Sequence, residues 1–130
     1  MKFMCLVYFD DTSFAGMSEA DLTKLTDDTI AEDHDLRRRG KLILAQPLQG
    51  PETAVSVRVR AGKMQRTDGP FAETKEWLGG FMLIDAVDID EAVAIASEGR
   101  IPAIGRIEIR PVLVQVDSRT GQGRPELETR

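Results

Sequence analysis

The chain has 130 residues, of which 42% are hydrophobic and 30% are charged. A chain of this length forms one domain and buries enough apolar surface to fold without a metal ion or a disulfide. The formal net charge of −5 disfavours direct nucleic-acid binding, which needs a cationic surface to neutralise phosphates. No apolar stretch approaches the roughly 20 residues of a membrane-spanning helix, and the single cysteine, Cys5, indicates a reducing compartment. We therefore expect a cytoplasmic protein without a membrane segment.

The first elements are predicted from apolar runs and helix caps. Residues 2–9 are apolar on both faces and predict a central strand rather than a signal peptide, because Asp10 and Asp11 follow where a small-residue cleavage site would be needed. Ser18 and Asp21 resemble a capping box that begins a helix, and Gly40 ends it. Residues 41–45 predict a second strand.

The second half predicts a hairpin followed by strand, helix and strand. Valines alternate with polar residues over 55–60, a turn follows, and residues 63–67 return as the partner strand. Residues 77–84 predict another central strand, in which the adjacent Gly79 and Gly80 indicate a bulge or a close backbone approach. Asp88 caps a second helix that ends at Gly99, and residues 106–114 predict the last strand. Residues 118–130 are polar and predict a disordered tail, so the domain is expected to span 1–117.

This order of elements predicts an α+β fold, namely a ferredoxin-like split βαβ arrangement with an extra hairpin. Two helices can cover only one face of such a sheet. The other face also carries apolar side chains, so we expect a second copy to cover it by sheet-on-sheet packing. The expected assembly is a homodimer of the dimeric α+β barrel type.

Residues 68–76 read Asp-Gly-Pro-Phe-Ala-Glu-Thr-Lys-Glu and are followed by Leu-Gly-Gly-Phe at 78–81. This string resembles the DGPF branch of the YCII-related family, and the resemblance covers residue 1 to about residue 114. It implies a bacterial protein with a dimeric α+β barrel fold, and some members of the branch are associated with extracytoplasmic-function sigma factors. Related YciI-type proteins have a His–Asp pair, whose positions correspond here to Thr29 and Arg106. The catalytic roles of that pair are therefore not carried over.

The motif itself combines a turn with a charged segment. Asp68 can accept backbone N–H groups in a tight turn, Gly69 can adopt a positive φ, and Phe71 is expected to anchor the loop in the core. Glu73, Lys75 and Glu76 then place three charges within four residues. They either line a pocket for a polar ligand or form a solvated loop with an ion pair that contributes ~0–1 kcal/mol. The candidate ligand-binding residues are Asp68, Glu73, Lys75, Glu76 and Arg110.

The first helix supplies a second group of candidates. Asp33 falls on the apolar stripe that should face the sheet, where it either reaches solvent or lines a pocket, paired with an arginine such as Arg110. His34 lies off the stripe, either exposed or as a general base in a cleft between subunits. Tyr8 and Asp10 are cleft or core residues at the end of the first strand. The candidate catalytic residues are Asp33, His34, Asp68 and Glu73.

Two classes of function remain open from the sequence, beside a third possibility, a purely structural dimer. The first is a homodimeric domain that binds a small polar molecule in a cleft lined by residues 68–76, with cofactor-free acid–base chemistry as an open addition. The second is a regulatory or protein-interaction module associated with a sigma factor. A metal site is not expected because no Cys/His cluster occurs, and a cofactor is not expected because no phosphate loop or dinucleotide fingerprint occurs. Whether the protein is an enzyme stays undecided at this stage.

Overall fold

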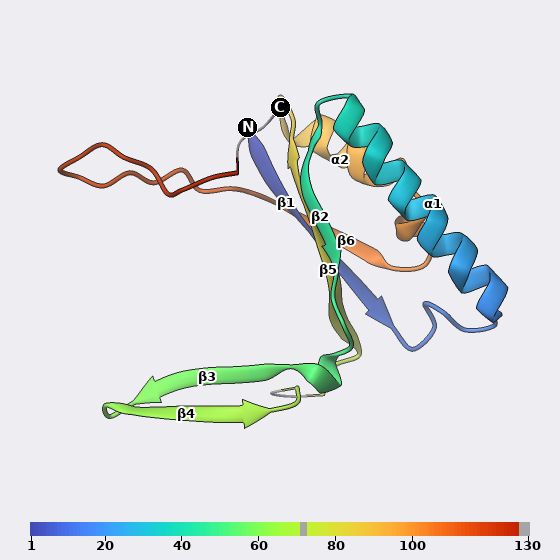
Figure 1. The fold of residues 1–130 in the computed structure, drawn as a ribbon, viewed down its shortest axis with the longest axis horizontal. Helices are drawn as coiled ribbons and strands as arrows, with labels where there is room; N and C mark the ends of the chain where they lie inside the picture. Colours follow the sequence, from blue (N-terminus) through green and yellow to red (C-terminus); the bar gives the residue numbers. More distant parts are fainter. Residues whose placement is uncertain (71–72, 128–130) are drawn as a thin grey trace.

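The computed structural model describes residues 1–70 and 73–127, and its elements follow the predicted order (Figure 1). The elements are β1 (Lys2–Asp10), α1 (Glu19–Arg38), β2 (Leu42–Pro47), η1 (Pro51–Thr53), β3 (Val55–Arg60), β4 (Lys63–Asp68), β5 (Glu76–Asp85), α2 (Ile89–Ser97), η2 (Ile101–Ala103) and β6 (Arg106–Pro111). The last strand is shorter than predicted: it ends at Pro111 rather than at residue 114.

The α+β fold is confirmed. Four antiparallel strands form one sheet in the order β2-β5-β1-β6, which is the ferredoxin-like order, and β3 and β4 form a separate two-stranded sheet. The predicted bulge is also present: Val7 pairs with Gly80 but Tyr8 pairs with Leu78, so Gly79 is the extra residue of β5. A Cβ at Gly79 would overlap the Phe9 ring, which explains why glycine is needed there.

Both helices begin at the predicted caps. The Ser18 hydroxyl accepts from the Asp21 backbone N–H and the Asp21 carboxylate accepts from the Ser18 N–H, so both halves of the capping box form. Asp88 caps α2 by accepting from the Glu91 N–H. At the other end of α1, Arg39 makes a two-pronged ion pair with Glu98 after α2, which ties the two helices together. Arg39 therefore has a structural role, and a cation at this position also suits the C-terminus of a helix.

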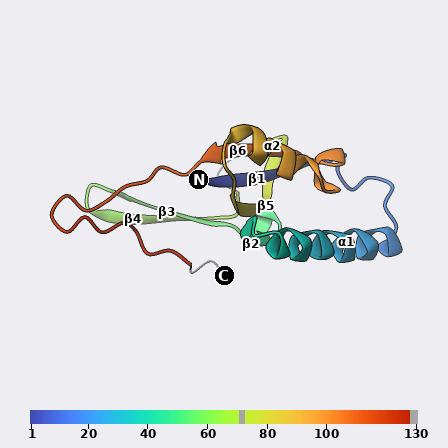
Figure 2. The ribbon, with the colours of Figure 1, turned by 90° about the horizontal axis from the view of Figure 1, so that it is seen from above.

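The two helices lie on one side of the sheet (Figure 1), with α1 beside β2 and α2 beside β6 and β1 (Figure 2), and the main core lies on this side. Phe3, Cys5 and Ile84 are almost completely buried there. The core also includes Leu36, Leu42, Ala86, Ala92, Ile95 and Ala96. Neither helix, within the described part of the chain, has the length and apolarity that a bilayer span needs.

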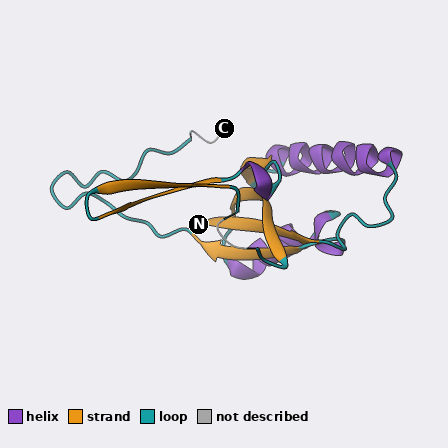
Figure 3. Ribbon diagram, turned by 90° about the horizontal axis from the view of Figure 1, so that it is seen from below, coloured by secondary structure: helices purple, strands orange, loops and turns teal. Residues whose placement is uncertain are grey.

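The opposite face of the sheet, here called the helix-free face, also carries apolar residues. Side chains alternate along a strand, so the residues that lie between core residues along the strands point away from the helices. The half-buried apolar residues on this face are Met4 and Leu6 on β1, Leu44 on β2, and Phe81 and Leu83 on β5. The β3–β4 hairpin and the segment 112–127 both project on this side, away from the helices (Figures 1 and 3). The helix-free face is thus bordered by two projecting segments.

The segment after β6 has local order within its described residues. Val116 pairs with Gly123 in an isolated bridge, and the Asp117 carboxylate accepts from the backbone N–H groups of Arg119 and Thr120. These bonds close a turn, while Leu113 and Val114 are exposed at 77% and 85%. The disorder expected over 118–130 stays a prediction.

Candidate functional site

A polar arrangement on the helix-free face joins three strands at one end of the sheet. Tyr8 lies near the end of β1, Glu76 begins β5 and Arg106 begins β6. The Arg106 Nε lies 3.2 and 3.1 Å from the two Glu76 carboxylate oxygens, and its Nη2 lies 3.1 Å from Oε1. The guanidinium carbon of Arg106 lies 4.6 Å from the centroid of the Tyr8 ring. Ion pairing and a cation–π contact therefore fix this arginine on two sides.

The charge state of Arg106 follows from these neighbours. The hydrogen bonds that Arg106 donates to Glu76 raise the pKa of Arg106 further above its ordinary value, with Glu108 contributing through its charge. The arginine is thus a permanent cation. Its Nη1 makes no hydrogen bond to any residue that the structure describes. One edge of the guanidinium is therefore open to an added acceptor.

The predicted motif, residues 68–76, is divided in the structure between the end of β4 and the start of β5. Asp68 ends β4, where its carboxylate accepts from Arg66 Nε at 2.7 Å, so it belongs to the hairpin. Gly69 has the expected positive φ, +81°, and its N–H donates to the Ala54 carbonyl. The predicted anchoring of Phe71 lies outside the described residues. Of the four charged candidates in the motif, Glu76 alone contacts the Tyr8–Arg106 pair.

Glu73 and Lys75 lie in the segment that enters β5, and both are exposed. Between them, the Thr74 hydroxyl donates to the Glu76 carbonyl. This bond holds the segment close to the start of β5. Glu73 and Lys75 therefore come within a few residues of the Arg106 cluster along the chain, without joining its hydrogen bonds.

Asp33 lies on the other side of the sheet. It is half-buried on α1, and burial, with a smaller effect from Glu32, raises its carboxyl pKa. The predicted pairing of Asp33 with Arg110 is wrong: Arg110 alternates with Ile109, which packs against the helices, so Arg110 faces the helix-free side. His34 is exposed. The candidates on α1 and those on β5 and β6 therefore form two separate groups.

Arg110 shares the helix-free face with Arg106. It lies four residues farther along β6, about 13 Å at the rise of an extended strand. Glu108 lies between them on the same face, opposite Leu6. Arg110 is therefore on the predicted face but is not part of the Arg106 cluster.

Two other residues considered from the sequence have local roles. The Asp10 carboxylate accepts from the Thr12 N–H and hydroxyl, which lower its pKa and close the turn after β1. Cys5 is fully buried, and burial raises its thiol pKa to about 11, which disfavours the reactive thiolate.

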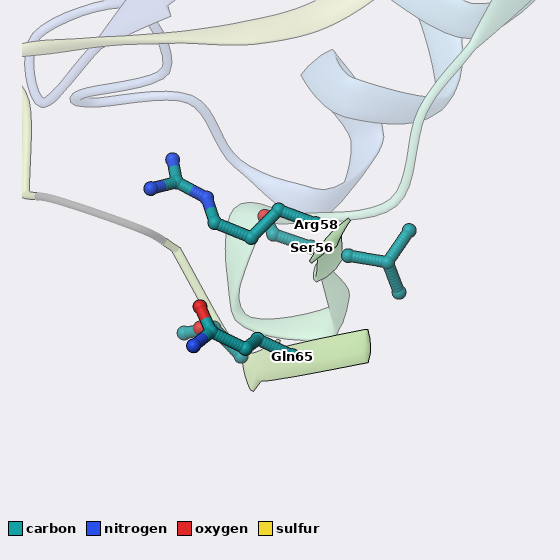
Figure 4. Close-up of a pocket in the computed structure, with 5 residues that line it drawn as sticks. Ser56, Arg58 and Gln65 are labelled. Carbon is teal, nitrogen blue, oxygen red and sulfur yellow. The ribbon is translucent and has the colours of Figure 1, made fainter. Parts of the chain in front are cut away.

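A shallow hollow of about 200 Å³ lies on the hairpin (Figure 4). It is lined by Ser56, Val57, Arg58, Gln65 and Thr67, none of which was a candidate from the sequence. It has no carboxylate, and it lies on a separate sheet from the Arg106 cluster. Among the described residues, no group of three or more His, Cys, Asp or Glu is placed to hold a metal ion.

The sequence prediction missed the Glu76–Arg106 contact. A partial signal was present, because charged residues alternate with Ile107 and Ile109 along β6 and so mark a face that the helices do not cover. The pairing itself joins residues 30 positions apart. It depends on β5 and β6 both lying next to β1, which a single sequence does not reveal.

Comparison with known proteins confirms the YCII-related family, while the DGPF branch stays a prediction. The sequence model of a protein family, the YCII-related domain, matches residues 1–115. An uncharacterized protein of Rhizobium meliloti (strain 1021) is 34% identical over 114 residues, which cover 86% of this chain and 92% of that relative. The family match includes β1 to β6 and therefore the whole Tyr8–Glu76–Arg106 cluster. The chain belongs to the YCII-related domain family.

Proposed function

We propose that this protein is a homodimer that binds a small polar molecule at the Tyr8–Glu76–Arg106 end of its helix-free face. The observation that carries the proposal is the position of a fixed, partly open arginine at the edge of an apolar sheet surface. Ligand sites commonly combine apolar walls with a few positioned polar groups. The ordinary alternative is a solvated surface ion pair, since the Arg106 and Glu76 side chains are 52% and 39% exposed.

The homodimer is inferred from the helix-free face. Its half-buried residues Met4, Leu6, Phe81 and Leu83 form a contiguous apolar surface on the central strands β1 and β5. A soluble protein rarely leaves such a surface open to water. A second copy that packs sheet against sheet would cover it and would place the Arg106 cluster at the border of the interface.

The ligand class follows from the charges at this end. The open edge of Arg106 and the nearby Lys75 favour an anionic group, since a guanidinium recognises carboxylates and phosphates through paired N–H donors. Glu76, Glu73 and the Tyr8 hydroxyl offer acceptors for ligand hydroxyl or amino groups. A small hydroxy acid or amino acid fits this set. Cofactor-free proton transfer at Glu76 stays an open addition to the binding proposal.

A thermal-shift screen against carboxylates, phosphates and amino acids tests the proposal, with mass measured by light scattering. A ligand at 100 times its Kd should stabilise the protein by ~2.7 kcal/mol. The stabilisation should disappear in Arg106→Gln and weaken in Lys75→Ala. It should persist in Arg119→Gln, whose side chain is 88% exposed in the turn at Asp117.

Either of two results would contradict the proposal. A hit that survives Arg106→Gln would place the ligand elsewhere. A well-behaved dimer that no compound stabilises, but that co-purifies with a sigma factor, would instead favour the regulatory module.

A further inference from the structure

The β3–β4 hairpin exposes apolar side chains to an unusual degree. Val55, Val57, Val59 and Met64 are 50%, 70%, 60% and 66% exposed. Val55, Val57 and Val59 alternate along β3 and Val59 is opposite Met64, so these four apolar residues share one face of the hairpin. Arg66, opposite Val57, and Asp68, opposite Val55, lie on the same face as an ion pair. The other face carries the polar side chains of the hollow in Figure 4.

An isolated two-stranded hairpin is only marginally stable in water. Neither β3 nor β4 hydrogen-bonds to the four-stranded sheet. The base of the hairpin is closed by the bond from Gly69 N–H to the Ala54 carbonyl. An apolar face of valines on such a projecting ribbon is best explained by a protein surface that covers it.

The charge of the hairpin indicates which surface that is. Residues 55–68 contain four cations and one carboxylate, a net charge of +3, whereas the whole chain has −5. Helix α1 contains seven carboxylates against three cations, a net charge of −4 with His34 neutral. The hairpin is therefore complementary to the helix layer of another copy of the same chain.

The reach of the hairpin fits this partner. Each strand has 6 residues, which extend about 20 Å. Two packed sheets lie about 10 Å apart, and a helix layer lies about 10 Å beyond a sheet. The hairpin projects on the helix-free side (Figures 1 and 3), so its tip passes the partner's sheet and comes level with the partner's helices.

We propose that the β3–β4 hairpin is a clasp that packs on a second copy of this chain. Its valine face lies against the edge of the partner's sheet, and its cationic tip, Arg60 and Lys63, lies toward the partner's α1. This inference rests on the homodimer of the proposed function and adds the element that holds it closed. A basic ribbon can also bind a DNA duplex, which is the competing role of the hairpin.

Sedimentation equilibrium of the full chain tests the clasp. Val57→Ser should weaken the dimer roughly tenfold or more, because both hairpins lose a buried apolar contact. Val87→Ser is the matched control, since Val87 is 71% exposed against 70% for Val57 but lies beside α2. Lys63→Glu should also weaken the dimer, and added salt should weaken the wild-type dimer more than this variant. Far-UV circular dichroism verifies that each variant is folded.

The possible results distinguish failure of the clasp proposal from failure of the homodimer proposal. A wild-type chain that stays monomeric at the highest concentration overturns both. A wild-type dimer whose Kd is unchanged by Val57→Ser and Lys63→Glu overturns the clasp alone. Saturable binding of a short DNA duplex that Lys63→Glu abolishes, with the dimer unaffected, assigns the hairpin to nucleic acid and also overturns the clasp.

Discussion

Replacement of Leu6 by aspartate should separate the two copies of the proposed dimer. Leu6 is half-buried near the centre of the helix-free face, with Phe81 opposite on β5 and Glu108 opposite on β6. In a single copy the new carboxylate can reach water, so the fold should persist. In the dimer it would be buried without a partner, and the neighbouring Glu108 would repel it.

The expected effect is large because the dimer is symmetric. An uncompensated buried charge costs about 3–5 kcal/mol. Two such charges cost about 6–10 kcal/mol, and each 1.4 kcal/mol is a factor of ten in Kd. The dimer should therefore weaken at least ~10,000-fold, with the far-UV circular dichroism spectrum unchanged.

Sedimentation velocity over a range of concentrations measures the effect, with Val87→Asp as the control. Val87 is 71% exposed outside the helix-free face, so its replacement should leave the association unchanged. A folded Leu6→Asp protein that dimerises with the wild-type Kd would refute the packing of this face against a second copy.

Three further predictions concern the helix-covered side. Phe3→Ala, at a side chain only 1% exposed, should cost about 3–5 kcal/mol in urea unfolding, whereas a loss below ~1 kcal/mol would contradict the core assignment. Asp33→Asn should stabilise the protein at neutral pH, because burial raises the Asp33 pKa above its unfolded value. The contribution of Asp33 to stability is then fully present below about pH 3.9 and is lost as the pH rises through the raised pKa. The free energy of unfolding of Asp33→Asn, measured at several pH values, should increase relative to that of the wild type as the pH rises. A difference that does not change with pH would count against a buried Asp33. Cys5, with its pKa raised to about 11, should react with a thiol reagent only as fast as the protein unfolds, and fast labelling of the native chain would show that the thiol is accessible.

The elements of the fold were predictable because their signals are local. Ser18 with Asp21 and Asp88 with Glu91 cap the helices through contacts three residues apart, and the alternating valines mark β3. The end of β6 was not predicted, since the apolar residues 112–114 continue the strand pattern beyond Pro111. The strand ends there because its partner β1 begins at Lys2, and Pro111 pairs with Phe3.

The candidate site was predicted only in part, because its contacts join residues that are far apart in the sequence. The motif indicated charges at residues 73–76, and the structure brings Glu76 onto Arg106 and Tyr8. The proposed Asp33–Arg110 pair failed because the two residues lie on opposite sides of the sheet. Helix periodicity shows which residues share a face of α1, but it does not show what lies across from them.

A calorimetric titration of the best thermal-shift ligand into the wild type, Glu76→Gln and Glu98→Gln tests the proposed ligand site most directly. Glu98 is a matched control, because it also makes a two-pronged bond to an arginine and is similarly exposed, 44% against 39% for Glu76. We expect one ligand per chain and unchanged affinity in Glu98→Gln. In Glu76→Gln, where Arg106 loses the charge that orients it, the affinity should fall roughly tenfold or more. Equal affinity in all three proteins would contradict a ligand site at Tyr8, Glu76 and Arg106.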